Sequence, residues 1–341
     1  MSSTVTKGKL LVRGSINIDE FFVLPHIVRS GETISSTDYS KRAGGKGANQ
    51  AVSAAKAGAE VSFAGHIGND GAWLRELLEG YKVDTSQLHE DPSVPTGRAM
   101  IQLSTETRDN SIVLLPGANF STSPLPFSSL ASAGYTHLLL QNEIPLASTR
   151  SFLTEAHQAG LVTIFNPSPM LSPAELESFE WNALDWLLVN EGEAEELVEI
   201  LGGKKVDSAE VLSALRRVES LKGLTGILMT RGGDGVVAAL GGPEGDTIHV
   251  GPGEVVGSVV DTTGAGDCFT GYFTTLLSSL PPSTPLSSSK LAAILNVASQ
   301  AAAMCVEKEG AMESVPMLRD VKERMESSGR WKSEESWSGL L

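Results

Sequence analysis

The residues best suited to chemistry form the segment Asp261–Asp267, with the sequence Asp-Thr-Thr-Gly-Ala-Gly-Asp. The apolar stretch Cys268–Leu277 follows at once and is typical of a helix whose first turn starts at Asp267. Backbone N–H groups in a first helical turn have no partner within the helix, and glycines before them let a ligand approach closely. The segment therefore predicts a site for a migrating phosphoryl group, formed by Gly264, Ala265 and Gly266.

Asp267 stands at the same point and is the candidate general base. A hydroxyl that attacks the phosphoryl group must approach this carboxylate, which would orient the hydroxyl and accept its proton. Phosphoryl transfer demands little of such a base, because its transition state is loose. The alternative interpretation is an acidic residue that only stabilises the helix dipole.

The phosphates of a nucleotide need further donors. No GxxxxGK[ST] string occurs, so a P-loop is excluded, and Gly45-Lys46-Gly47 has the lysine without a following Ser or Thr. A second glycine-rich turn is a candidate phosphate nest, although it could equally be a plain hairpin. It consists of Thr230, Arg231, Gly232, Gly233, Asp234 and Gly235.

Two segments predict a site for a ligand with several hydroxyls. In Arg42–Gln50, two glycines let a ligand approach the backbone, and Lys46 and Asn49 offer donors at the start of a predicted helix. Asn17 and Asp19 lie two residues apart on an extended chain, so they share one side and together can bind neighbouring hydroxyls. The alternative for this pair is a solvated strand end.

Short apolar runs alternate with helical stretches along most of the chain, which predicts an α/β fold with a doubly wound, mostly parallel sheet and helices on both faces. Ligands bind such sheets beyond the carboxyl ends of the strands. Four predicted strands end in polar residues, namely Gln141, Asn166, Asn190 and Thr230. The alternative is that these residues merely begin turns.

Two segments break the alternation. Gly31–Tyr39 and Val94–Leu115 have strand-like patterns and no helix between strands, so we expect them to form a small β-sheet lid. We therefore expect a single domain over residues 1–326, with this lid inserted, and a loosely ordered polar tail over 327–341.

The composition limits the classes of ligand and partner. The chain has 341 residues, with 26 basic and 41 acidic side chains and a formal net charge of −15, so neither nucleic acid nor an anionic membrane is an expected partner. It contains no run of 18 apolar residues, and MSSTVTKGKL lacks the apolar core of a signal peptide. Two cysteines without CxxC spacing favour a reducing compartment. We expect this to be the cytoplasm, and the nucleus is the alternative.

From about residue 10 to about residue 325, the chain resembles the ribokinase-like (PfkB) carbohydrate kinases. Gly44–Asn49 and Asp261–Asp267 look like the two signatures of that family. Ser15–Asp19, Pro116–Asn119 and the segment 308–316 are also similar. The resemblance implies an α/β domain with a β-sheet lid that often forms a homodimer contact.

By position, the resemblance assigns sugar contacts to Asn17, Asp19, Gly45, Lys46, Gly47, Asn49 and Glu143, with Asp267 as the base. It assigns nucleotide contacts to Asn190, the turn from Thr230 to Gly235, and Gly266. The Asn190-Glu-Gly-Glu193 string is similar to a family motif tied to Mg²⁺ and phosphate. An activating K⁺ ion would be held by Asp261, Thr263, Cys305, Lys308, Gly310 and Ser314, the last four mainly through backbone oxygens. The position near adenine falls on Ser299 by spacing, or on Asn296 after a small shift.

The implied activity is transfer of the γ-phosphoryl group of ATP to the 5-hydroxyl of D-ribose. Related kinases act on fructose, 2-keto-3-deoxygluconate or adenosine, and these substrates remain alternatives. An inactive sugar-binding regulator on the same scaffold is a further alternative, but the presence of Asp267 and of the whole anion site argues against it. No aromatic cluster lies among the expected sugar contacts to stack a nucleobase, which weakens the nucleoside alternative.

Overall fold

The computed structural model describes residues 8–123, 130, 132–280, 286–331 and 337. Within this part of the chain, the main sheet has the strand order β13-β12-β11-β10-β9-β8-β1-β4-β5. All neighbours from β5 to β11 are parallel, and β12 and β13 continue the sheet as antiparallel strands. The strands are β1 (Lys9–Arg13), β4 (Glu60–Gly68), β5 (Leu88–Asp91), β8 (His137–Gln141), β9 (Val162–Asn166), β10 (Trp186–Asn190), β11 (Gly226–Thr230), β12 (Val236–Leu240) and β13 (Asp246–Val250).

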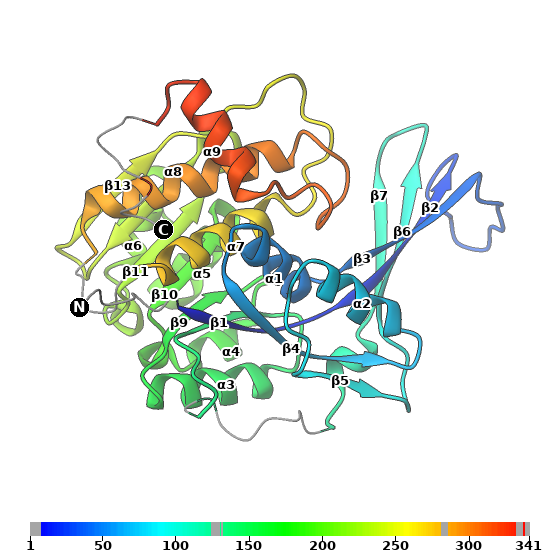
Figure 1. Cartoon of the computed structure of the whole chain (residues 1–341), viewed down its shortest axis with the longest axis horizontal. Helices are drawn as coiled ribbons and strands as arrows, with labels where there is room; N and C mark the ends of the chain where they lie inside the picture. Colours follow the sequence, from blue (N-terminus) through cyan, green and yellow to red (C-terminus); the bar gives the residue numbers. More distant parts are fainter. Residues whose placement is uncertain (1–7, 124–129, 131, 281–285, 332–336, 338–341) are drawn as a thin grey trace, which may run out of the picture.

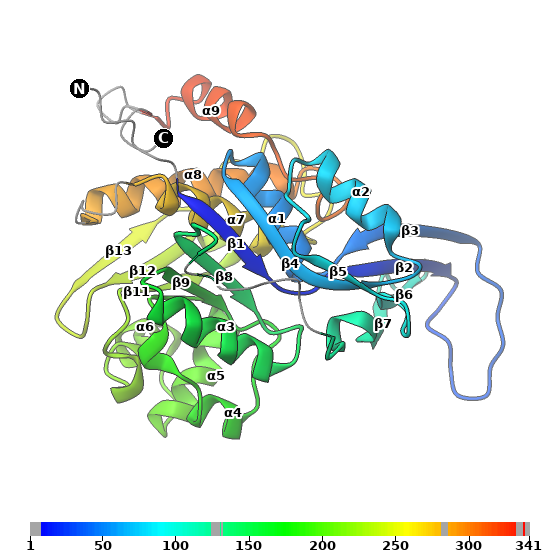
Figure 2. The same ribbon diagram turned by 60° about the horizontal axis from the view of Figure 1, so that its bottom comes forward.

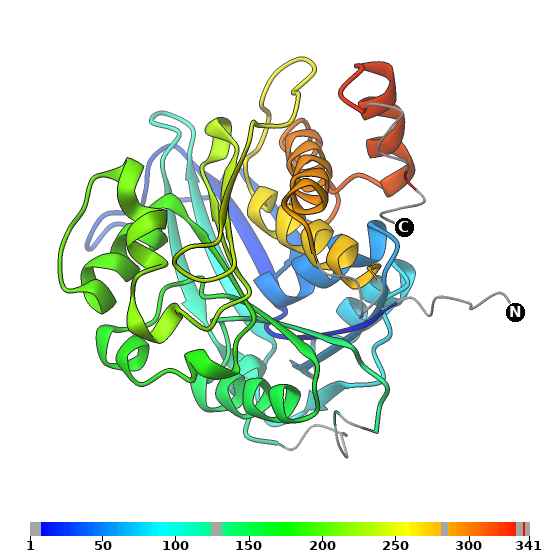
Figure 3. The ribbon, with the colours of Figure 1, turned by 90° about the vertical axis from the view of Figure 1, so that its left-hand side faces the viewer.

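Helices cover both faces of this sheet, as Figures 1, 2 and 3 show from three directions. One layer contains α1 (Lys46–Lys56), α2 (Ala72–Gly80), α7 (Ala265–Ser278), α8 (Ser288–Cys305) and α9 (Leu318–Ser327). The other contains α3 (Leu146–Gln158), α4 (Pro173–Glu177), α5 (Glu191–Gly202) and α6 (Val211–Leu215). Each layer has its own apolar core.

The two cores explain why the central strands are continuous apolar runs. Side chains alternate along a strand, so Leu10 and Val12 pack into the first core while Leu11 packs into the second. The predicted α/β fold, with a mostly parallel sheet between two helical layers, is confirmed.

A second sheet, here called the lid sheet, projects from the body on the right of Figures 1 and 2. Its order is β3-β2-β6-β7, and β2 runs antiparallel to β3 but parallel to β6. On β6, Arg98 pairs with Glu20 of β2 and with Asp70 in a loop of the body. The lid strands are β2 (Asn17–Leu24), β3 (Asp38–Gly44), β6 (Gly97–Ser104) and β7 (Asn110–Leu115).

The lid sheet agrees with the expected β insertion in kind but not in all its boundaries. Residues 31–37 form no strand, because exposed turns fill this segment and Gly31 has a φ of 77°. The strand begins at Asp38 and runs to Gly44. β2 was not expected as a lid strand, yet it pairs with both β3 and β6.

The ends of the chain lie mainly outside the described residues, including the MSSTVTK segment, 332–336 and 338–341. In the described part of the tail, the rings of Trp331 and Trp337 stack with centroids 4.0 Å apart and pack against the first core. The sequence contains no apolar run long enough to span a membrane, and in the described ranges no helix is long and apolar enough to cross a bilayer.

Candidate active site

The carboxyl ends of four neighbouring parallel strands form the floor of the candidate site. Gln141 of β8 pairs in register with Asn166 of β9, and Asn190 of β10 pairs with Thr230 of β11. These are the four polar strand ends singled out in the sequence. They lie beside the point between β1 and β8 where the strand order reverses, which is the usual ligand position in doubly wound sheets.

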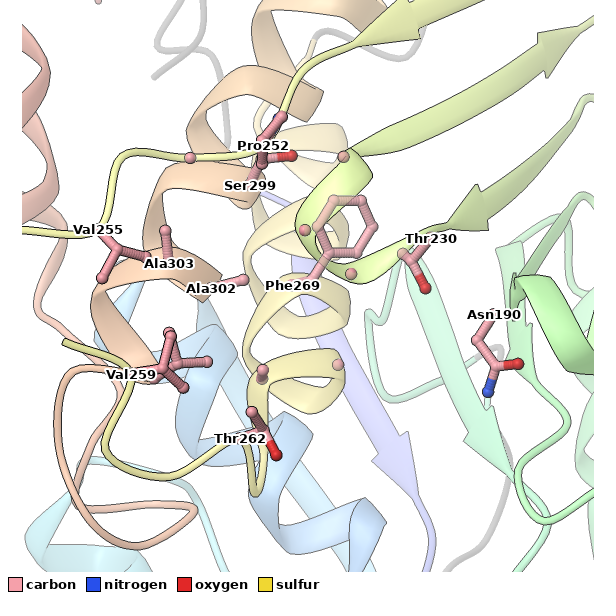
Figure 4. A pocket seen from close by; sticks show the side chains of 17 residues that line it. Asn190, Thr230, Pro252, Val255, Val259, Thr262, Phe269, Ser299, Ala302 and Ala303 are labelled. Carbon is pink, nitrogen blue, oxygen red and sulfur yellow. The ribbon is translucent and has the colours of Figure 1, made fainter.

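Two adjoining cavities open above this edge. The larger has a volume of about 460 Å³ and is mainly apolar, and the smaller has about 250 Å³. Figure 4 shows the larger one, with Asn190 and Thr230 on one side and Val255, Val259, Ala302 and Ala303 on the other. The two cavities share Asn190, Thr230, Thr262, Gly266 and Phe269 as lining residues. A ligand with an apolar end and a polar end can therefore extend from one cavity into the other.

The N-terminus of α7 lies where the cavities meet. Gly264 precedes the helix with a φ of 76°, and a Cβ there would lie 2.8 Å from the Ala311 backbone. A Cβ at Gly266 would meet nothing within 4 Å, because this residue faces the open cavity. Among the described residues, no acceptor is found for the backbone N–H groups of Gly266 and Asp267. These groups can therefore bind an anion. The predicted site also included Gly264 and Ala265, but the Ala265 N–H donates to the Thr262 carbonyl at 3.3 Å.

Asp267 points into the smaller cavity from a buried position, with 8% of its surface exposed. Its Oδ2 accepts a hydrogen bond from Asn49 Nδ2 at 3.0 Å. Its Oδ1 accepts one from Gln50 Nε2 at 2.9 Å. Two consecutive residues of α1 therefore fix the plane of the carboxylate.

The expected sugar contacts come from β2, from the junction of β3 with α1, and from the end of β8. Asn17 pairs with Gly44 and Asp19 with Arg42 across β2 and β3. A Cβ at Gly44 would collide with the Asp19 carboxylate, so only glycine leaves room there. Burial, followed by the nearby charges of Glu143 and Glu313, raises the pKa of Asp19 from 3.8 to about 7.

Glu143 and Lys46 connect these elements through a hydrogen bond. Glu143 Oε2 accepts hydrogen bonds from Ser15 Oγ at 2.6 Å and from the Lys46 backbone at 2.9 Å, which ties β8 to the start of α1. Lys46 lines the smaller cavity together with Asp267. No partner of the Lys46 ammonium is found in the described ranges, which leaves this cation for a ligand.

The glycine-rich turn is both a hairpin and a wall of the larger cavity. A 3₁₀ turn, Gly232–Asp234, connects the antiparallel strands β11 and β12. Thr230, Gly232, Gly233 and Gly235 line the cavity, whereas Arg231 and Asp234 do not. Arg231 instead pairs with Glu191 at 3.3 Å.

The structure separates the two candidates for the adenine position. Ser299 lines the larger cavity. The Asn296 side chain instead donates to the Ala292 carbonyl of its own helix at 2.8 Å and does not line the cavity. Ser299 therefore borders this cavity and Asn296 does not.

The Asn190-Glu-Gly-Glu193 string forms a capping box at the start of α5. Asn190 Oδ1 accepts from the Glu193 backbone at 2.8 Å, and Glu193 Oε2 accepts from the Asn190 backbone at 2.9 Å. Both residues also line the smaller cavity. No group of three or more His, Cys, Asp or Glu with metal-ligand geometry occurs in the described ranges. The amide and carboxylate oxygens of Asn190 and Glu193 are donor types that Mg²⁺ accepts, and magnesium bound to phosphates and water needs few ligands from a protein.

The residues expected at the K⁺ site come from two segments that lie together. Asp261 accepts hydrogen bonds from the backbones of Thr263 at 2.9 Å and Gly310 at 3.0 Å. Burial opposes ionisation of Asp261, but these hydrogen bonds outweigh it and hold its pKa below the ordinary value. The Cys305 thiol lies 2.9 Å from Ser314 Oγ in the core, so Cys305 can offer a cation only its backbone oxygen. An oxygen-rich donor set of this kind fits a hard monovalent cation.

Several residues of the site had been given no role from the sequence. Gln50 directly follows Asn49 in the quoted segment, and Gln141 and Asn166 were noted only as polar strand ends. Asn119 donates to Asn17 Oδ1 at 2.7 Å, and nothing in its sequence position indicates this contact. The apolar wall of the larger cavity also lacked a local signal, because Val255 and Val259 meet Ala302 and Ala303 from a separate segment of the chain.

Comparisons with known proteins agree with this geometry. The model of the pfkB family carbohydrate kinases matches residues 7–318. A curated ribokinase of Haemophilus influenzae is 33% identical over 322 residues, covering 93% of this chain and 98% of the relative.

Two solved structures extend the comparison to ligands. The ribokinase of Cryptococcus neoformans var. grubii serotype A in complex with ADP is 47% identical, with a TM-score of 0.79 and coverage of 93% of this chain and 99% of that one. The Arabidopsis thaliana ribokinase complexed with ribose and ATP is 28% identical, with a TM-score of 0.80 and coverage of 93% and 98%. The protein described here is therefore a carbohydrate kinase that uses ATP, and it belongs to the pfkB family.

Proposed function

We propose that this kinase transfers the γ-phosphoryl group of ATP to the 5-hydroxyl of D-ribose, giving ribose 5-phosphate and ADP. The observation that carries the proposal is the position of Asp267, a buried carboxylate beside free backbone N–H groups where an apolar cavity meets a polar one. The relatives named as ribokinases support ribose as the sugar.

In this mechanism the larger cavity holds the nucleoside of ATP, and its phosphates extend toward Gly266. Asp267 orients the sugar hydroxyl and accepts its proton as the phosphoryl group moves. The N–H groups of Gly266 and Asp267, together with the Lys46 ammonium, stabilise the negative charge on the phosphoryl oxygens. Asn49 and Gln50 hold the carboxylate in place, so little reorganisation is needed when the hydroxyl arrives.

Sugar choice rests on Asn17, Asp19 and their neighbours. Asn17 Oδ1 accepts from Asn119, so its NH₂ group remains to donate to a sugar oxygen. Asp19 supplies acceptors beside it, and donor and acceptor together suit two neighbouring hydroxyls. A site of this kind discriminates strongly against analogues without those hydroxyls, because its own polar groups are then left unpaired.

Two ions belong to the proposal. Mg²⁺ would reach the smaller cavity with the phosphates, near Asn190 and Glu193, and would neutralise phosphate charge when bound. K⁺ would be held by Asp261, Thr263 and backbone oxygens of the segment 305–314. Since Gly310 already bonds to Asp261, a cation there would stiffen the segment that carries Gly264.

We also propose a homodimer through the lid sheet. Large apolar side chains on one face of β7 are exposed, with Ile112 at 51% and Leu114 at 61%. Monomeric proteins rarely leave such a patch uncovered, and a second lid sheet would cover it. The two cysteines are buried free thiols, which supports a reducing compartment such as the cytoplasm.

A panel of acceptors tests the proposed substrate. ADP release is measured with D-ribose, 2-deoxyribose, D-fructose and adenosine at matched concentrations, with a control that lacks any acceptor. We expect the highest kcat/KM with D-ribose. A higher value with any other acceptor would reject ribose as the preferred substrate and leave only the kinase assignment.

A further inference from the structure

A chain of buried amides leads to the catalytic carboxylate from the end of the sheet. Gln50 of α1 is fully buried, and so is Gln141 at the end of β8. A buried polar side chain is costly unless its hydrogen-bonding groups find partners, so these two residues need a reason to be where they are. Neither belongs to the sugar or nucleotide contacts described above.

The orientation of each amide follows from one fixed acceptor. The Leu188 backbone carbonyl can only accept, and it takes a hydrogen bond from Asn166 Nδ2 at 2.9 Å. Asn166 Oδ1 therefore faces Gln50 and accepts from its Nε2 at 3.1 Å. The same Gln50 Nε2 donates to Asp267 Oδ1 at 2.9 Å, which uses both of its hydrogens.

Gln141 fixes the other end of the Gln50 amide. Its Nε2 donates to Gln50 Oε1 at 2.6 Å. If the Gln50 amide were turned over, its oxygen would face both Asp267 and the oxygen of Asn166, and its NH₂ group would face the NH₂ group of Gln141. Asp267 and Asn166 therefore favour the orientation in which a donor points at the carboxylate. Gln141, whose own Oε1 finds no partner among the described residues, then donates to the amide oxygen at the other end.

We propose that Gln50 is a positioning residue for the phosphoryl-transfer step, and that Gln141 supports it by donating to its amide oxygen. The inference rests on the proposed role of Asp267 as the base. Asn49 bonds to one carboxylate oxygen and Gln50 to the other, so together they stop the carboxylate from rotating away from the incoming hydroxyl. An amide suits this task because it donates without becoming charged itself.

The direct test replaces Gln50 with methionine, which has a similar volume and no donor. Losing a hydrogen bond to a charged group should lower kcat by about 10- to 100-fold. The KM values for D-ribose and ATP should change by less than about threefold, because Gln50 touches neither ligand. Gln141→Met removes only the donor to the Gln50 amide oxygen and should lower kcat by a smaller factor.

Ser53→Ala is the matched control. Ser53 is also fully buried on α1, and its hydroxyl donates to the Cys268 carbonyl of α7 at 2.8 Å. This variant removes a bond between the same two helices without touching Asp267, so its kcat should remain near the wild-type value. Thermal melting of each variant checks that the fold is retained.

A double-mutant cycle with Asp267→Asn separates positioning from packing. If Gln50 acts through the carboxylate, Gln50→Met should cost little more kcat once Asp267 is replaced. An equal loss in both backgrounds, or a Gln50→Met enzyme within about threefold of wild-type kcat, would overturn the inference.

Two further outcomes keep the test decisive. If Asp267→Asn alone keeps a near-normal kcat, the proposed base is wrong and this inference falls with it. If Asp267→Asn loses most of its kcat but Gln50→Met does not, only the inference about Gln50 is overturned. If Gln50→Met does not fold, the same cycle is made with Gln141→Met, whose loss of kcat should likewise disappear in the Asp267→Asn background.

Discussion

The pKa of Asp19, raised to about 7, should make the affinity for D-ribose, the proposed substrate, depend on pH in the physiological range. Burial is the main cause, and the charges of Glu143 and Glu313 add to it. An ionised carboxylate can accept hydrogen bonds from two sugar hydroxyls, whereas the protonated form loses part of that capacity. We therefore expect ribose to bind chiefly to the ionised form.

The size of the effect follows from the fraction that is ionised. With a pKa of about 7, that fraction is about 0.1 at pH 6 and about 0.9 at pH 8. Because apparent affinity is reduced by the fraction of competent protein, the dissociation constant for ribose should be about tenfold lower at pH 8 than at pH 6.

Isothermal titration calorimetry of D-ribose binding at pH 6, 7 and 8 checks this expectation. Binding at pH 7 should release about half a proton, which is obtained by repeating the titration in buffers of different ionisation enthalpy. Asp19→Asn serves as the control, since it binds more weakly but should show no dependence on pH in this range. A flat wild-type profile without proton release would refute the reasoning, because it would mean that Asp19 does not change its charge when the sugar binds.

The other predictions concern stability, catalysis, the cation and the lid sheet. The raised pKa of Asp19 disfavours its ionised form in the fold, so the stability of the ligand-free protein falls as pH rises from about 4, the ordinary value, to about 7. Asp19→Asn should therefore raise the Tm more at pH 8 than at pH 5, and an unchanged Tm at pH 8 would argue against a buried carboxylate that is costly to ionise. Asp267→Asn should lower kcat by roughly 10²–10⁴-fold with both ligands still bound, as measured by ADP release and calorimetry, and a loss below about fivefold would remove Asp267 from the role of base. Replacing potassium with sodium should lower turnover, and unchanged kcat and ATP affinity would count against a cation at Asp261. Hydrolysis of ATP without sugar should be far slower than phosphoryl transfer, since closure of the lid sheet over the sugar would exclude water. Equal rates of hydrolysis and transfer would contradict this closure.

The sequence predicted the parts of the site that arise from local patterns. The string from Asp261 to Asp267 indicated a helix N-terminus with free donors, and both the helix and the donors are present. The polar ends of the strands indicated one edge, because parallel strands always bring their carboxyl ends together.

What the sequence did not predict depends on contacts between distant segments. Gln50 contacts Asp267 across 217 positions of the chain, and no spacing rule indicates such a pair. The start of β2 was interpreted only as an extended chain that carries Asn17 and Asp19, and its pairing with β3 and β6 in the lid sheet was not predicted. Asn296 and Ser299 lie on one helix, and only the packing of α8 against the cavity determines that Ser299 lines it and Asn296 does not.

Phosphorus-31 NMR of the product tests the central claim most directly. The enzyme is incubated with ATP, Mg²⁺ and D-ribose, and the new phosphomonoester signal is recorded without proton decoupling. Transfer to the 5-hydroxyl predicts ADP together with a sugar phosphate whose phosphorus couples to the two protons of a methylene carbon. A signal coupled to a single ring proton, or inorganic phosphate in place of any sugar phosphate, would contradict the account.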